Sequence, residues 1–203
     1  MKTLILALFF IFGCTHGFAN NNENKLIGRV VKNLDLDKYE GEWFEIARVP
    51  NSFQKKCLKN VTATYGEDAK NKLVTVTNKC EKNDGSQVVA NGRARFNSNF
   101  KKTKGALEVT FVKLVGNWIF KFVSGNYWVI NLGSDADYGF SVIAEPSLKM
   151  AWILSRSSSL SKTKLKSAAK SLSDFGYDPC ELIMTVQDNG NEKQNTKLCD
   201  FLK

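Results

Sequence analysis

The stretch Tyr39–Gln54, YEGEWFEIARVPNSFQ, decides the fold, because Gly41-Glu42-Trp43 within it reads as the start of a β-strand. A second run, Trp152–Arg156, closes another strand far along the chain. Between them, short segments alternate apolar and polar residues and are broken by turn residues such as Asn83-Asp84-Gly85 and Gly133-Ser134-Asp135. This period of two predicts antiparallel strands rather than helices.

Eight strands at short, regular spacing favour an all-β fold, an antiparallel up-and-down β-barrel that leaves no exposed sheet edge. Ser161–Phe175 breaks the pattern, because its apolar residues recur at helical spacing with lysines opposite. This predicts one C-terminal α-helix packed outside the barrel, and a short final strand, Glu181–Val186, is expected after it. The eight expected barrel strands are Glu42–Val49, Val61–Glu67, Lys72–Lys79, Gln87–Phe96, Ala106–Val112, Tyr127–Leu132, Gly139–Glu145 and Met150–Arg156.

The length of 203 residues and the hydrophobic content of 43% fit one domain. Residues 1–19 read as a signal peptide, with a basic start, an apolar run and a cleavage site after Ala19. The alternative is a lipoprotein signal that ends before Cys14. Asn20–Lys25 is polar and expected to be disordered within a linker, residues 20–34, that leads to the domain, residues 35–203. We therefore expect a secreted or periplasmic protein or, in the alternative, an outer-membrane-anchored lipoprotein.

The Gly-x-Trp start at Gly41, the exit through Ala47-Arg48-x-Pro50 and the distant strand that ends in Arg156 resemble the lipocalin family. The resemblance is strongest to its apolipoprotein D and bacterial lipocalin branch and covers Leu36–Asp188. It implies a small barrel whose interior holds a ligand. Antiparallel order brings the start of the first strand and the end of the last to one end of the barrel. The resemblance implies a cluster that plugs this closed end, and its residues are Gly41, Trp43, Tyr138 and Arg156.

Four cysteines remain once Cys14 is set aside, and an even number in an exported domain predicts two disulfides. Spacing allows three pairings and does not choose among them. The resemblance implies a bond between Cys57 and Cys199, which leaves Cys80 to pair with Cys180.

The chain's one histidine, His16, lies in the segment expected to be removed, which excludes histidine-based catalysis in the mature protein. Neither a CxxC nor an HExxH pattern is present, so we expect no metal and no cofactor. The favoured function is not enzymatic. In the alternative of a lipid-modifying lipocalin-type enzyme, Cys80 is the candidate nucleophile.

Alternation also predicts which side chains face the barrel interior. In Gln87–Phe96 the small and apolar residues share one face, which leaves room for one small ligand. In Tyr127–Leu132 the pairs Tyr127/Val129 and Trp128/Ile130 both fit an inward face. A solid core filled by side chains is the alternative to a cavity. The candidate ligand-binding residues are Tyr65, Val76, Ala90, Ala94, Phe96, Val109, Phe111, Tyr127, Phe140, Val142, Trp152 and Leu154.

The opposite end of the barrel is expected to be the open mouth, where Phe53 lies beside Lys55, Lys56 and Lys59. The connection Lys113–Asn126 is unusually apolar. It reads either as an extension of the flanking strands or as a lid or membrane-facing rim. In the second reading, lysines hold an anionic head group. The formal charge of +9 fits a solvated basic surface or attraction to anionic lipid, and no nucleic-acid-binding motif accompanies it.

These features favour an exported carrier of small hydrophobic ligands, with fatty acids or lysophospholipids as the expected class. The protein is expected to be a monomer or weak dimer, with contact to a membrane surface and none to nucleic acid. A secreted protein-binding or inhibitor lipocalin is a further alternative. Asn60-Val61-Thr62 matches a glycosylation sequon, which has meaning only in a eukaryotic host.

Overall fold

The computed structural model describes residues 19–136 and 138–203. Apart from Ala19, the expected signal peptide lies outside the described residues, together with Cys14 and His16. No helix in the part of the chain that the structure describes is long and apolar enough to cross a membrane.

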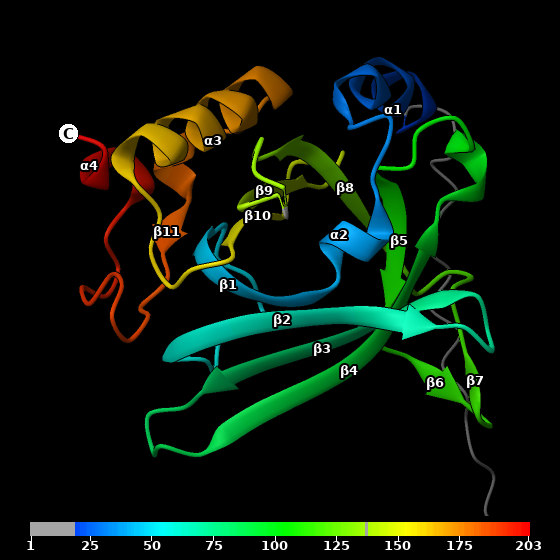
Figure 1. The fold of residues 1–203 in the computed structure, drawn as a ribbon, viewed down its shortest axis with the longest axis horizontal. Coiled ribbons are helices and arrows are strands. Elements are labelled where there is room, and N and C mark those ends of the chain that lie inside the picture. The colour runs from blue at the N-terminus through cyan, green and yellow to red at the C-terminus, as the bar shows by residue number, and fades with distance from the viewer. Residues whose placement is uncertain (1–18, 137) are drawn as a thin grey trace, which may run out of the picture.

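A single antiparallel sheet forms the body of the molecule (Figure 1). Its strands follow the order β10-β9-β8-β5-β4-β3-β2-β1-β11, and the pairing of β10 with β1 closes the barrel. The prediction of an eight-stranded barrel followed by an outer helix and a short strand is confirmed. The strands of the sheet are β1 (Gly41–Arg48), β2 (Lys59–Asp68), β3 (Leu73–Glu81), β4 (Gln87–Phe96), β5 (Ala106–Thr110), β8 (Gly125–Leu132), β9 (Phe140–Ala144), β10 (Ala151–Ser155) and β11 (Ile183–Met184). A separate two-stranded sheet pairs β6 (Lys113–Leu114) with β7 (Asn117–Trp118).

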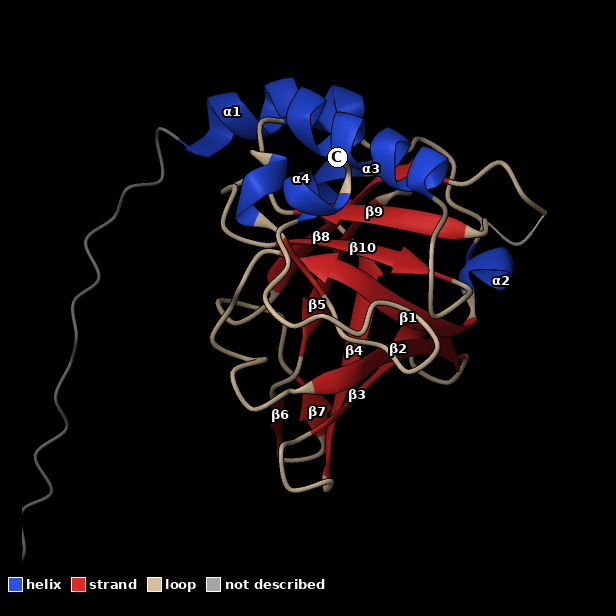
Figure 2. Cartoon of the chain, turned by 90° about the vertical axis from the view of Figure 1, so that its left-hand side faces the viewer, coloured by secondary structure: helices blue, strands red, loops and turns tan. Residues whose placement is uncertain are grey.

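The helices α1, α3 and α4 gather on one side of the barrel, as Figure 2 shows, and α2 lies apart from them. The long helix α3 begins after Ser161, whose side chain accepts a hydrogen bond from the Lys164 backbone N–H, and it ends before Gly176. The helices are α1 (Ala19–Leu26), α2 (Leu36–Tyr39), α3 (Lys162–Phe175) and α4 (Leu198–Phe201), with short 3₁₀ turns η1 (Ile27–Arg29), η2 (Ser98–Phe100) and η3 (Pro179–Glu181).

The segment before the barrel differs from its prediction. The disorder expected at Asn20–Lys25 is wrong, because this stretch lies within α1. Val30 and Leu34, which fall in the expected linker, are each only 3% exposed and pack with the barrel. Composition alone gave no sign of this packing, since the polar residues of α1 precede the apolar ones that become buried.

Two hydrophobic cores flank the barrel wall. The inner core lies inside the barrel and includes Trp43, Ile143 and Leu154. The outer core lies between the wall and the helices and includes Trp128, Leu165 and Leu172. Strand β9 contributes to both cores, and each of its residues is buried.

Two disulfides form, as expected, but the expected pairing of Cys57 with Cys199 and Cys80 with Cys180 is wrong. Cys57 is bonded to Cys80, and Cys180 to Cys199. The loop after β1 folds to the end of β3, and α4 packs beside η3, so each cysteine finds a partner close to it in sequence.

The C-terminal segment closes a gap between β1 and β2. Their pairing runs only from Gly41 to Phe44 on β1, and beyond this point the two strands separate. The buried Gln187 side chain spans the gap, and its Nε2 donates to the carbonyls of Glu45 at 2.9 Å and Val61 at 2.8 Å. The Asn60 amide of the sequon is held at the same place by Asp188, 2.7 Å from its Nδ2.

Candidate functional site

The barrel interior contains most of the predicted lining. Alternation places Tyr65, Val76 and Ala94 on inward faces, and these three are buried. On the other side of the barrel, the ambiguity in β8 is resolved, since Tyr127 and Val129 point inward and Trp128 points outward. The predicted residues that lie in the inner core or pack against it are Tyr65, Val76, Ala94, Val109, Tyr127, Trp152 and Leu154.

The inward positions predicted on β9 are wrong. Phe140 and Val142 lie in the outer core against α3, while Ile143 lies in the inner core and Ser141 bonds to an interior tyrosine. Because α3 covers the outer side of β9, the wholly apolar face of this strand points outward, while the inner face carries Ser141 beside Ile143. Hydrophobic alternation therefore indicates the wrong direction here.

Near the mouth, inward-facing positions are open to solvent. Ala90 shares the inner face of β4 with Gly92 and Ala94, yet Ala90 is exposed. Phe111 is 44% exposed, and its ring packs against Gly92. A Cβ added to Gly92 would lie only 2.8 Å from carbons of this ring. Only Arg93–Phe96 of β4 pair with β5. The preceding part of β4, residues 87–92, therefore borders this opening.

The base of the barrel is closed by the cluster that the resemblance implied. The Arg156 guanidinium lies 3.9 Å from the Trp43 ring centroid and donates to the carbonyls of Lys38 and Glu42. Gly41 has a φ of +90°, and a Cβ there would lie 3.4 Å from Arg156. The Tyr138 hydroxyl accepts a hydrogen bond from the Asp35 backbone N–H.

A cavity of about 160 Å³ lies at this base, between α2 and the ends of β2, β3 and β4. Tyr39, Tyr65 and Phe96 border it, and Phe96 is 43% exposed there instead of lying deep in the interior. A void of this size holds a benzene-sized molecule, and pockets for larger ligands usually measure about 300–1,000 Å³. The cavity at the base is therefore too small by itself for a whole acyl chain.

Four hydroxyl groups form a buried chain across the interior. Tyr127 lies between Tyr65, at 2.9 Å, and Tyr39, at 2.8 Å, and Tyr39 lies 2.9 Å from Ser141. Burial raises the pKa of Tyr39 to about 12 and also raises those of Tyr65 and Tyr127. All three are therefore neutral at physiological pH. Each of the three hydrogen bonds uses one O–H proton, and the four hydroxyl groups have four. One proton is therefore left that can be donated to an oxygen outside the chain.

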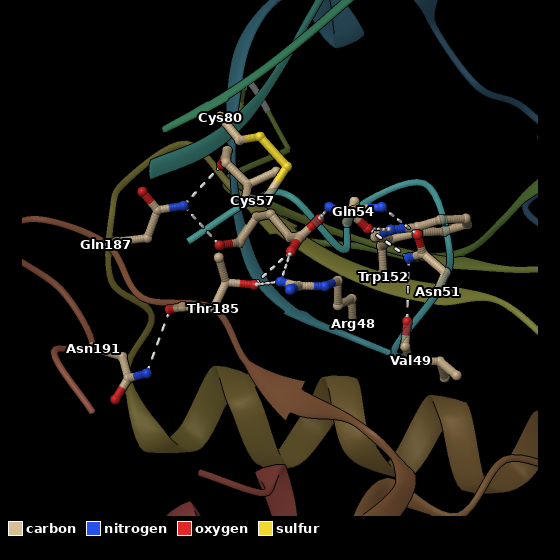
Figure 3. A network of polar contacts seen from close by, with 12 residues as sticks. Arg48, Val49, Asn51, Gln54, Cys57, Cys80, Trp152, Thr185, Gln187 and Asn191 are labelled. Carbon is tan, nitrogen blue, oxygen red and sulfur yellow. Dashed lines mark hydrogen bonds and ion pairs between the residues drawn. A yellow bond between two sulfur atoms is a disulfide. The ribbon is translucent and has the colours of Figure 1, made fainter. Parts of the chain in front are cut away.

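A second polar group lies closer to the mouth (Figure 3). Glu45 follows the inward Trp43 by two positions, and its buried carboxylate accepts from Arg48 Nη1 at 2.7 Å and from Gln54 Nε2 at 2.6 Å. Thr185 donates to the same carboxylate, and Trp152 donates to Gln54 at 3.3 Å. Sequence reasoning missed Glu45 and Arg48, although a charged residue two positions after an inward tryptophan was a signal that could have found them.

The rim lysines divide into two groups. Lys59 is paired with Asp188, 2.9 Å away, which makes it a structural residue rather than a contact for an anionic head group. Lys55 and Lys56 are exposed, and neither makes an ion pair within the described residues.

Two features of the structure bear on the enzymatic alternative, the state of Cys80 and the groups that could hold a metal ion. Because Cys80 is bonded to Cys57, the nucleophile required by the enzymatic alternative is not a free thiol. The described residues contain no group of three or more His, Cys, Asp or Glu side chains that could hold a metal ion.

Comparisons with known proteins agree with this geometry. A family model described as a lipocalin-like domain matches residues 34–187. Temperature-induced lipocalin-1 of Arabidopsis thaliana is 32% identical over 167 residues, covering 82% of this chain and 87% of that protein. Outer membrane lipoprotein Blc of Escherichia coli K12 is 30% identical over 158 residues, covering 78% and 82%. Apolipoprotein D of Macaca fascicularis is 28% identical over 193 residues, covering 92% and 94%.

Among solved structures, insecticyanin from the tobacco hornworm Manduca sexta superposes with a TM-score of 0.60 at 22% identity. The match covers 81% of this chain and 93% of that one, which supports the fold alone.

Proposed function

Because the chain belongs to the lipocalin family, whose members bind small hydrophobic ligands, we propose that it carries one fatty acid or lysophospholipid in the barrel. The observation that carries the proposal is the inner face of β4, which is made of the small residues Ala90, Gly92 and Ala94, with the Phe111 ring packed over Gly92. Ala90 is open to solvent at the mouth, and Ala94 on the same face is buried deep in the interior. An acyl chain entering along this wall gains about 25 cal/mol for each Å² of apolar surface buried.

The charge of the ligand decides its orientation. Burying a carboxylate among neutral hydroxyls costs several kcal/mol, and the interior cation Arg48 is already neutralised by Glu45. The exposed Lys55 and Lys56 lie in the loop after β1. We therefore place the anionic head group near these lysines and the acyl chain inside. The spare O–H proton of the tyrosine chain suits a neutral oxygen farther along the ligand.

Export and membrane contact belong to the same proposal. Two disulfides favour an oxidising compartment, either the periplasm or the extracellular space. Ligands of this class reside in membranes, so a carrier of them works at a membrane surface, and its positive charge of +9 favours anionic ones.

Native mass spectrometry of protein purified from its own host tests this function. We expect one lipid of the fatty acid or lysophospholipid class per chain, and displacement of a fluorescent fatty acid by the extracted lipid. Protein that carries no lipid and leaves the fluorescent fatty acid unbound would contradict the proposal. The intact mass would also report whether Cys14 is retained and lipidated.

A further inference from the structure

The segment Val112–Val123, here called the hairpin segment, lies outside the barrel rather than across its mouth. It leaves the end of β5 and contains β6 and β7, which Figure 1 shows beside β4. Lys113 pairs with Trp118 and Leu114 with Asn117, so Val115 and Gly116 form a two-residue turn. The segment therefore neither extends the neighbouring strands nor covers the interior.

One side of the hairpin segment is anchored to the barrel wall. Arg93 and Arg95 of β4 lie over the rings of Trp118 and Phe120, at 4.9 and 4.1 Å from their centroids. The Thr110 hydroxyl donates to the Ile119 carbonyl at 2.6 Å. Phe120, which would be exposed if this connection were a lid or rim, is only 7% exposed. These contacts fix the segment, so the exposure of its other residues is a defined feature of the fold.

The other side presents apolar residues in a costly backbone conformation. Val115 and Phe122 are each 91% exposed, and their φ angles are +47° and +68°. Left-handed backbone is unfavourable for β-branched and bulky residues, and Asn-Gly is the favoured dipeptide in a turn of this kind. Valine and phenylalanine are therefore unfavourable at these positions for two reasons. Their apolar side chains are exposed to water, and their backbone adopts a conformation that these residue types disfavour. Residues that break local rules without a structural gain point to a function.

The charge of the segment identifies the partner. Lys113 and Lys121 flank the exposed apolar residues, and Val112–Val123 contains no acidic residue. Apolar side chains beside lysines match the interface of an anionic bilayer, where acyl chains lie below phosphate groups. We propose that the hairpin segment docks on an anionic lipid bilayer, with Leu114, Val115 and Phe122 inserted below the head groups.

Two substitutions test this surface without straining the backbone. Val115→Asn and Phe122→Gly together suit the left-handed conformation, so the melting temperature should stay the same or rise by about 2–4 °C. Binding to vesicles of phosphatidylcholine and phosphatidylglycerol, measured by co-sedimentation, should fall about tenfold or more, because the inserted apolar surface is lost. Binding of a fluorescent fatty acid in solution should not change, which separates this test from the proposed carrier function.

Leu148→Asn is the matched control, since Leu148 also has a positive φ, +60°, but lies in the loop between β9 and β10. It should leave vesicle binding unchanged. Lys113→Gln with Lys121→Gln alters no backbone preference and should also weaken binding, with a smaller effect of added salt. Wild-type protein that does not sediment with anionic vesicles would overturn the proposal. Binding by the Val115→Asn, Phe122→Gly variant within twofold of wild type would overturn it as well.

Discussion

Glu45 and Arg48 form an ion pair inside the barrel, with 2.7 Å between Oε1 and Nη1. Their side chains are 4% and 11% exposed, so neither charge is well solvated. A β-bulge between Glu45 and Ala47 brings these two residues, three apart in sequence, to the same side of β1. The pair places two opposite charges in the interior, where each compensates the lost solvation of the other.

Removing one partner of this pair should be costly. Arg48→Ala leaves the Glu45 carboxylate with only neutral donors, and we expect a loss of about 3–5 kcal/mol in the free energy of unfolding. Urea denaturation measures this value. In a double-mutant cycle, Glu45→Gln with Arg48→Met should lose less than the sum of its single changes. A loss below about 1 kcal/mol for Arg48→Ala would show that the pair is not needed to compensate the charge.

Gln187 should contribute strongly to closure of the barrel between β1 and β2. Gln187→Ala removes the donor to two backbone carbonyls in a buried gap, so we expect a loss of about 2–3 kcal/mol. Glu192→Ala, at an exposed position of the same tail, serves as the control and should change stability by less than about 0.5 kcal/mol. Equal effects of the two changes would argue against the bridging role.

The buried tyrosines predict loss of stability at alkaline pH. Tyr39 ionises near its ordinary pKa of about 10 when unfolded, whereas burial raises its pKa to about 12 in the folded protein. Above pH 10 the unfolded state loses its proton first, so the free energy of unfolding falls as pH rises towards 12. For Tyr39 alone the fall is about 2–3 kcal/mol.

Denaturation curves at pH 9 and pH 12 measure this fall, and Tyr39→Phe should show a smaller difference between the two. The quantity compared is the change in the free energy of unfolding between pH 9 and pH 12. A loss of stability that Tyr39→Phe causes equally at both pH values therefore cancels. An identical pH dependence in Tyr39→Phe and wild type would contradict the assignment.

The sequence predicted the framework well wherever local pattern and tertiary packing agree. The bounds expected for Gln87–Phe96 are those of β4, and the expected helix differs from α3 only at Ser161, its capping residue. Strands with one polar face gave a clear alternation. Antiparallel strand order brought Trp43 and Arg156 to the same end of the barrel, and the resemblance implied the cluster in which they are in contact.

The remaining errors arise where a strand or loop depends on a partner distant in the sequence. Phe140 and Val142 were assigned to the interior because nothing in β9 itself reveals that α3 covers its outer face. The pairing of Cys57 with Cys80 depends on the path of a loop, which spacing does not encode. The anchoring of Phe120 by Arg95 required knowledge of which strand lies beneath the hairpin segment.

In the proposed function, the inner face of β4 leads a ligand from the mouth into the barrel. Ala90 lies on that face, and its neighbour Val89, 51% exposed, lies on the opposite face of the same strand. Titration with a fluorescent fatty acid should show that Ala90→Trp weakens binding by at least about tenfold, because the indole fills the entrance, while Val89→Trp binds like wild type. Equal affinity in the two tryptophan variants would contradict the account.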